Sequence, residues 1–440
     1  MQTVFGFPYA EVQFTRDGRV HDPAEVERLS AMVSTVDVTD LFVVSHGWNN
    51  DMDEARRLYA DLLQHIRAHI DANAVPGAGD LMFGVLAVLW PSKKFAEKEL
   101  IPSAAASLDD LVDDTALAAQ VDDFAAAVGG DHTKARLEEI KPLIPQLDDD
   151  PAARRAVAEI IRSVLPQRSQ DPEDASDEFF SEDPGELMER LAEIILPAPI
   201  LPTGDSGGAA DFTDAESEVG QAQGLSEVLD GARAAARRLL NYATYYVMKD
   251  RAGLVGRGLV PVLEQLNSER PDMQMHLVGH SFGGRLVTST TATWDNARTA
   301  IASLCLLQAA FSHNGFAQRW DGTHDGAFRG VILNHRVSGP VMITCTKNDR
   351  AVGLAYPIAS RIARQAAAAL GDRDDPYGGL GRNGAQRTPE ATDGFLLPVG
   401  GRYSLSGGRL YNLVADDFIS DHGDIVSNEV TYALLTAVTT

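Results

Sequence analysis

Cationic side chains are scarce in this chain of 440 residues. It holds 38 Lys and Arg against 63 Asp and Glu, which gives a formal net charge of −25 at pH 7. Binding to nucleic acid or to an anionic membrane surface depends on clustered cations. The composition therefore argues against both classes of partner.

Cysteines and long apolar runs are also rare. Cys305 and Cys345 each lie inside a short apolar run, so we interpret them as reduced core residues rather than as a disulfide framework. No stretch approaches the roughly 18 uninterrupted apolar residues of a membrane span. The first residues lack the basic and apolar regions of a secretory signal. We expect a soluble, cytoplasmic protein without an integral membrane segment.

The negative charge is concentrated in one segment. Residues 101–220 hold 28 Asp and Glu and 8 Lys and Arg, a net charge of −20, whereas the rest of the chain holds 35 and 30. Within this segment, Asp150 and Asp183 each precede a proline and then an apolar stripe with helical spacing, a pattern typical of a capped helix start. We therefore expect 101–225 to be an inserted acidic helical cap, or lid.

Outside that segment, apolar and β-branched runs alternate with helical patterns. Continuous apolar runs separated by helices indicate buried parallel strands. Segment 4–15 is expected to add antiparallel strands at an edge of the sheet. We predict that residues 1–100 and 226–440 form one α/β domain, with a mostly parallel central sheet flanked by helices. The expected buried strands are residues 41–45, 81–90, 273–279, 303–309, 341–346 and 409–415.

A G-x-S-x-G motif, Gly279-His280-Ser281-Phe282-Gly283, stands between an expected strand and a helical pattern. In this context the serine occupies a strained turn, and the glycines let the helix pass close to the strand. The strain points the serine Oγ away from the sheet, and the helix N-terminus favours developing negative charge. We predict that Ser281 is a nucleophile.

A serine nucleophile needs a base to remove its proton and a carboxylate to orient that base. Asp349 follows the expected strand 341–346, and His422 follows the expected strand 409–415. The order Ser281, Asp349, His422 is the one that an α/β-hydrolase requires. Four other acids near the histidine are interpreted as turn caps: Asp416, Asp417, Asp421 and Asp424.

Acyl transfer also needs N–H donors for the oxyanion of the tetrahedral intermediate. One is expected from the amide of Phe282, which follows the nucleophile. The second is expected from the loop after strand 41–45, where we assign the amide of Trp48, with Gly47 as the alternative. His46 in the same loop is interpreted as structural.

Together these motifs resemble the serine hydrolases of the α/β-hydrolase superfamily. HGWNN (46–50) follows one expected strand and WPS (90–92) the next, while GHSFGG (279–284), KND (347–349) and DHGD (421–424) complete the set. The HGWNN and WPS pair resembles uncharacterised bacterial α/β-hydrolases more than well-studied lipases. The resemblance covers the predicted α/β domain and not the insertion. It implies an α/β-hydrolase fold and a Ser–His–Asp acyl hydrolase that uses neither a metal nor an organic cofactor.

Two side chains are candidates for contact with the substrate. The ring of Trp48 is expected over the mouth of the pocket, with packing under the cap as the alternative. Phe311 follows strand 303–309, where α/β-hydrolases often line the acyl pocket. By contrast, His65 and His69, four residues apart on a helix, lack the further ligand of a zinc site, so we interpret them as solvated positions.

We expect a carboxylic-ester hydrolase that works through an acyl-enzyme and acts on a small-molecule or oligomeric ester. The same triad also serves acyltransferases, amidases and peptidases. A hydrolase fold without activity could instead be a binding or scaffold protein. The residues leave these alternatives open, together with acyl and alcohol specificity and oligomeric state.

Overall fold

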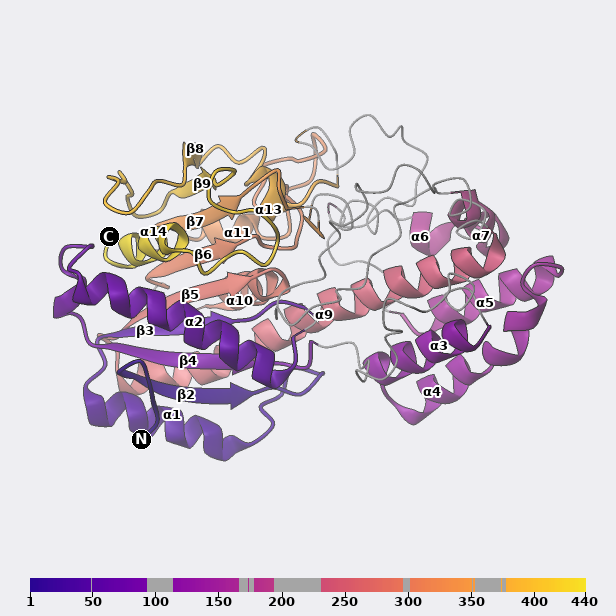
Figure 1. The fold of residues 1–440 in the computed structure, drawn as a ribbon, viewed down its shortest axis with the longest axis horizontal. Helices are drawn as coiled ribbons and strands as arrows, with labels where there is room; N and C mark the ends of the chain where they lie inside the picture. The colour runs from indigo at the N-terminus through magenta and orange to yellow at the C-terminus, as the bar shows by residue number, and fades with distance from the viewer. Residues whose placement is uncertain are drawn as a thin grey trace, which may run out of the picture.

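The computed structural model describes residues 1–48, 50–92, 114–165, 173, 178–193, 231–295, 301–349, 351–352, 373 and 377–440. These residues show an α/β fold with a nine-stranded sheet in the order β1-β2-β4-β3-β5-β6-β7-β9-β8 (Figure 1). Neighbouring strands are parallel except β1 and β2. The expected α/β architecture with a mostly parallel sheet is confirmed. The strands are β1 (Thr3–Val4), β2 (Phe7–Gln13), β3 (Asp40–Ser45), β4 (Phe83–Leu89), β5 (Gln274–His280), β6 (Ser303–Leu307), β7 (Val341–Cys345), β8 (Ala391–Phe395) and β9 (Leu410–Val414).

The edges of the sheet depart from the sequence-based prediction. Segment 4–15 was expected to add antiparallel strands, and β1 does pair antiparallel with β2. However, β2 pairs parallel with β4. The helix α1 (Pro23–Val36) joins β2 to β3, and a helical crossover of this kind connects strands that run in the same direction. Because β3 is parallel to β4, β2 is parallel to β4 as well. At the other edge, β8 was not predicted. Its residues are exposed or half-buried, so it lacks the apolar run that marked the other strands.

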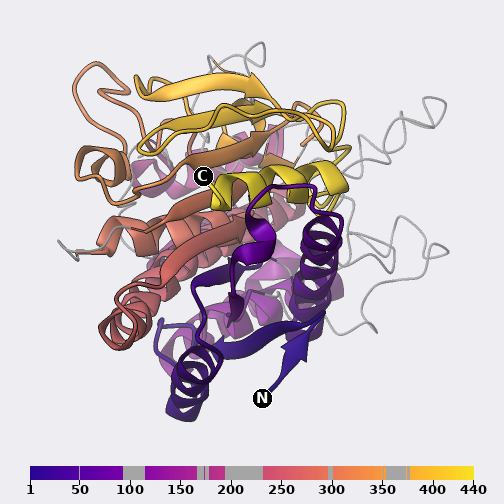
Figure 2. The same ribbon diagram turned by 90° about the vertical axis from the view of Figure 1, so that its left-hand side faces the viewer.

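Helices cover both faces of the sheet (Figure 2). On one face, α1, α9 (Ala232–Glu269) and α10 (Phe282–Thr293) share a large apolar core with the sheet. On the other face, α2 (Met52–Asp71) and α14 (Asn428–Val438) close a second core. Burial on both faces explains why the central strands are continuously apolar. Shorter helices are η1 (Ala78–Asp80), α11 (Arg329–Leu333) and α13 (Leu380–Asn383).

The described part of the insertion is helical and contributes no strand to the sheet. Its helices gather around the N-terminal part of α9, beyond the end of the sheet (Figure 1). α9 therefore belongs to both regions, because its C-terminal part packs on α10. The predicted cap on α5 is confirmed, since Asp150 Oδ1 accepts from Ala152 N at 2.8 Å. The insertion helices are α3 (Asp114–Val128), α4 (Asp131–Glu138), η4 (Lys141–Gln146), α5 (Pro151–Ser163), α6 (Glu178–Ser181) and α7 (Pro184–Glu193).

The parallel strands bring several loops to one edge of the sheet. β3, β5, β7 and β9 run in the same direction, so the loops after their carboxyl ends lie side by side. These loops carry the residues that the sequence singled out. Among the described helices, none has both the length and the apolar character needed to cross a bilayer.

Candidate active site

Ser281 occupies a tight turn between β5, which ends at His280, and α10, which begins at Phe282. Its backbone is strained, with φ of 55° and ψ of −124°. Such a conformation costs on the order of 1–3 kcal/mol in a residue other than glycine. The surrounding backbone holds it, because Ser281 N donates to Leu307 O at 3.1 Å and Ser281 O accepts from Gly284 N at 3.0 Å. The turn is the strand–turn–helix geometry that the motif predicts.

Glycines allow three segments to meet at this turn. A Cβ on Gly279 would lie 2.3 Å from Gly283 O, and one on Gly283 would lie 2.3 Å from Ser45 O. The helix therefore passes close to two strands, as the motif requires. Gly47 is equally confined, since its Cβ would lie 2.6 Å from Ser281 Cβ. The loop after β3 thus borders the predicted nucleophile directly.

His422 and Asp349 form a buried hydrogen-bonded pair. His422 Nδ1 lies 2.7 Å from Asp349 Oδ2, and the two residues are 6% and 0% exposed. A carboxylate only accepts, so the proton of the neutral imidazole sits on Nδ1 and the Nε2 lone pair is left to act as a base. The second carboxylate oxygen, Oδ1, accepts from Val352 N at 2.8 Å. The pair is therefore fixed in orientation by both carboxylate oxygens.

The competing acids near His422 hold turns instead. Asp416 Oδ1 accepts from Thr346 Oγ1 and from Lys347 N, both at 2.9 Å, and so ties the loop after β7 to the loop after β9. Asp421 accepts from Gly423 N at 2.7 Å. Likewise, Asp424 accepts from Ser420 N at 3.0 Å. These bonds fit the predicted role of turn caps for Asp416, Asp421 and Asp424.

Hydrogen bonds join the HGWNN and WPS segments. Trp90 Nε1 donates to His46 O at 3.0 Å, and Ser92 Oγ donates to Asn50 O at 2.9 Å. His46 N in turn donates to Tyr59 OH at 2.7 Å. Burial lowers the pKa of His46 to about 4, so its ring is neutral at pH 7. These contacts agree with a structural role for His46 and hold the two segments together.

An aromatic cluster surrounds the first residue of α10. The ring of Phe282 lies 6.0 Å from the ring of Trp48 and 5.3 Å from that of Tyr245 on α9. Phe282 N–H is the first amide of α10, a position without an intrahelical acceptor. Trp48 is half-buried, and its Nε1 has no hydrogen-bond partner among the described residues. Trp48 therefore packs against Phe282, the residue that follows the predicted nucleophile.

Phe311 lies in a closed aromatic cluster. Its ring is 5.9 Å from Phe316 and 5.1 Å from Phe328, and the residue is 1% exposed. A substrate could touch this ring only if the cluster opened. Its role in an acyl pocket stays a prediction.

His280 is a residue of the site that the sequence did not single out. Its Nε2 lies 2.9 Å from His422 O, and the two rings are 4.9 Å apart. A carbonyl only accepts, so Nε2 carries the proton and donates it. Burial, with a smaller effect from His422, lowers the pKa of His280 to about 3. This neutral histidine therefore ties the loop of His422 to the turn of the nucleophile.

The described residues include no group of three or more His, Cys, Asp or Glu that could hold a metal ion. Of the two helix histidines, His65 Nδ1 contacts Asp61 O at 2.9 Å. His69 was expected to be solvated, and this was wrong. It is 5% exposed, because α14 packs on α2, and its Nε2 contacts Asn428 O at 2.9 Å.

No family model matches this chain, and no curated protein or solved structure is significantly similar to it.

Proposed function

We propose that this protein is a serine hydrolase with an α/β-hydrolase fold, and that it cleaves carboxylic esters through an acyl-enzyme. The observation that carries the proposal is the buried pair of His422 and Asp349, joined at 2.7 Å. The other part of the proposed triad is Ser281, which is held at φ of 55° at the start of a helix. His280 links these two parts through its bond to His422 O at 2.9 Å.

The reaction begins when Ser281 Oγ attacks the ester carbonyl carbon. His422 Nε2 takes the hydroxyl proton, and Asp349 stabilises the imidazolium that forms. The tetrahedral intermediate carries its negative charge on the former carbonyl oxygen. Donors for that oxygen are the amide of Phe282 and an amide of the loop that holds Gly47 and Trp48.

Collapse of the intermediate breaks the bond to the alcohol oxygen. The alcohol leaves with the proton from His422, and the acyl group stays on Ser281. Water then attacks the acyl carbon while His422 removes a proton from it. The second tetrahedral intermediate collapses by breaking the bond to Ser281 Oγ, which takes the proton back from His422 as the carboxylic acid leaves. The buried position of the pair excludes bulk water from the imidazole, which strengthens its interaction with the carboxylate.

The direct test uses Ser281→Ala with p-nitrophenyl butyrate. We expect loss of turnover, together with loss of labelling by a fluorophosphonate that forms an adduct on Ser281 of the unaltered protein. Ser289→Ala is the matched control, because Ser289 is a buried serine further along α10. Activity that survives in Ser281→Ala would overturn the proposal.

The other reactions that use this triad differ in the group that accepts the acyl moiety. Adding a competing alcohol or amine to the assay and analysing the products separates them. Free acid as the main product supports a hydrolase, whereas a new ester or amide indicates an acyltransferase. A protein that neither turns over esters nor reacts with the fluorophosphonate would be a binding or scaffold protein.

A further inference from the structure

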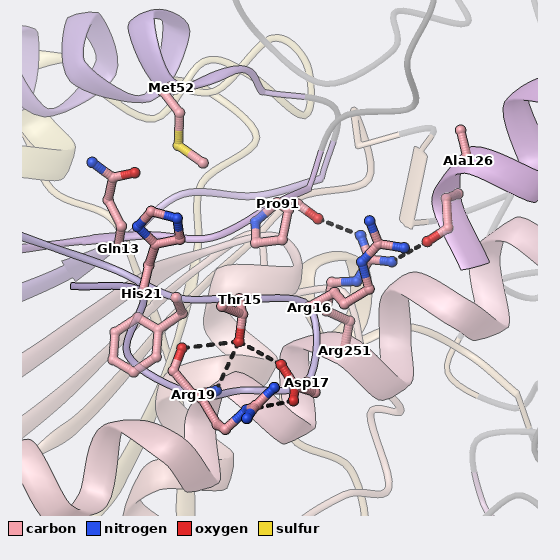
Figure 3. A pocket seen from close by; sticks show the side chains of 12 residues that line it. Gln13, Thr15, Arg16, Asp17, Arg19, His21, Met52, Pro91, Ala126 and Arg251 are labelled. Carbon is pink, nitrogen blue, oxygen red and sulfur yellow. Dashed lines mark hydrogen bonds and ion pairs between the residues drawn. The ribbon is translucent and has the colours of Figure 1, made fainter. Parts of the chain in front are cut away.

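A cavity of about 690 Å³ lies at the junction of the sheet and the insertion (Figure 3). Its walls come from the turn between β2 and α1, the start of α2, the loop after β4, the C-terminal end of α3 and the middle of α9. None of its lining residues belongs to the proposed triad. The lining residues are Gln13, Phe14, Thr15, Arg16, Asp17, Arg19, His21, Met52, Pro91, Ala126, Ala127 and Arg251.

Cations dominate the charge of this cavity. Three arginines line it, against one acid, Asp17. Asp17 is already engaged, because its Oδ2 lies 2.6 Å from Arg19 Nε. Arg16 and Arg251 have no carboxylate within ion-pair distance among the described residues, and Figure 3 shows their guanidinium groups near each other. Two uncompensated cations therefore remain in a chain whose net charge is −25.

Arg251 is the better buried of the two, at 5% exposed. Its Nη1 donates to Pro91 O at 2.5 Å, and its Nη2 donates to Ala127 O. Both acceptors are neutral carbonyls. Burial, with a smaller contribution from Arg16, lowers the pKa of Arg251 to about 10, and Asp250 has a smaller opposite effect. The guanidinium is thus held in place by hydrogen bonds while its charge lacks an ionic partner.

The remaining walls are largely apolar, with Phe14, Met52, Pro91 and the two alanines of α3. A guanidinium pair matches the oxygens of a carboxylate or a phosphate, and it can bind them with two parallel hydrogen bonds. An apolar body next to that group would cover the rest of the surface. We propose that this cavity binds an organic anion, a carboxylate or phosphate monoester with a short apolar body, through Arg16 and Arg251.

The position of the cavity couples it to the neighbouring loops. Pro91 precedes Ser92, whose Oγ donates to Asn50 O at 2.9 Å in the HGWNN segment. Arg251 bonds to the loop after β4 and to the end of α3, and so joins the sheet to the insertion. A bound anion would therefore stabilise this junction. The binding proposal stands independently of the proposed hydrolase activity.

Calorimetric titration of the full-length protein tests the proposal. The probes are hexanoate, phenyl phosphate and the neutral hexanamide, which matches hexanoate in size. We expect hexanoate or phenyl phosphate to bind and to raise Tm, and hexanamide to do neither. Comparison of the two anions tells a carboxylate site from a phosphate site. Equal binding of hexanamide, or no binding of either anion, would overturn the proposal.

Arg16→Gln locates the binding. Arg16 is exposed, so the variant should fold, and we expect its Kd for the anion to rise at least about tenfold. Arg28→Gln removes the same charge from an exposed position on α1, outside the cavity, and should leave Kd unchanged. An Arg16→Gln protein that binds as tightly as the unaltered protein would place the anion elsewhere and refute the assignment.

Discussion

Replacing Gly47 with Ala tests whether the loop after β3 acts on the nucleophile. The added Cβ would lie 2.6 Å from Ser281 Cβ, whereas ordinary contacts begin at 3.4 Å. One of the two residues must therefore move by about 0.8 Å, the difference between these distances. His280 O, 3.2 Å from the new atom, restricts the movement on the neighbouring side.

The expected effect on activity follows from that displacement. A shift of about 1 Å in a reacting group can lower the rate about 10²-fold. Loss of one oxyanion donor costs about 10²–10³ in kcat. We therefore expect kcat of Gly47→Ala on p-nitrophenyl butyrate to fall about 10²–10³-fold. The extra methyl group should also lower the free energy of unfolding by about 1–3 kcal/mol, as overpacking does.

Gly79→Ala is the matched control, because nothing lies within 4 Å of the Cβ it would add. Its kcat and Tm should equal those of the unaltered protein. Circular dichroism of Gly47→Ala at the assay temperature checks that the variant is folded. A folded Gly47→Ala protein that keeps more than a tenth of the activity would refute the placement of this loop against the transition state.

Two further predictions concern the acid and the buried histidines. Asp349→Asn should lower kcat about 10³–10⁴-fold, because the amide no longer stabilises the imidazolium. The control Asp424→Asn changes a half-buried turn residue that accepts from Ser420 N, and its kcat should stay within threefold of that of the unaltered protein. Equal losses of kcat in the two variants would reject Asp349 as the acid. Burial holds the pKa of His46 at about 4 and that of His280 at about 3. Both pKa values lie below that of a histidine in the unfolded chain, about 6.5, so the unfolded chain takes up protons first as the pH falls. The free energy of unfolding should therefore decrease between about pH 6.5 and pH 4. The decrease should be up to about 1.4 kcal/mol per pH unit for each histidine. Urea unfolding at several pH values measures how steeply the free energy of unfolding depends on pH. His280→Gln should reduce this pH dependence. An unchanged pH dependence would contradict the lowered pKa of His280.

Much of the fold could be predicted because burial leaves a local pattern in the sequence. Central strands such as β3 and β7 are buried along their whole length, so each appears as an apolar run. β8 has no such run, because it lies at the edge of the sheet and its residues are half-buried or exposed. The direction of β2 relative to its neighbour depends on its pairing with β4, which lies far along the chain, so nearby residues do not predict it.

The candidate site also combines residues that the sequence predicts with residues that it does not. Ser281, Asp349 and His422 could be proposed from motif, chain order and strand ends, all of which are visible in the sequence. The role of His280 could not, because its pKa depends on burial and its bond reaches His422 O, far along the chain. A signal was present, since His280 lies inside the motif. The position of His280 in the motif indicates its role only once the loop that carries His422 is known to lie next to it.

The position of Arg251, in the middle of α9, could not be predicted from local sequence patterns. Arg251 bonds to the carbonyl of Ala127, one of the last in α3, so it has a structural reason to be there. The end of a helix carries only about half a negative charge. Arg16 lies at the same end, since a Cβ on Gly129 would meet its guanidinium. Half a charge cannot balance two guanidinium groups, so helix capping explains where Arg251 lies and leaves more than one positive charge for a bound anion.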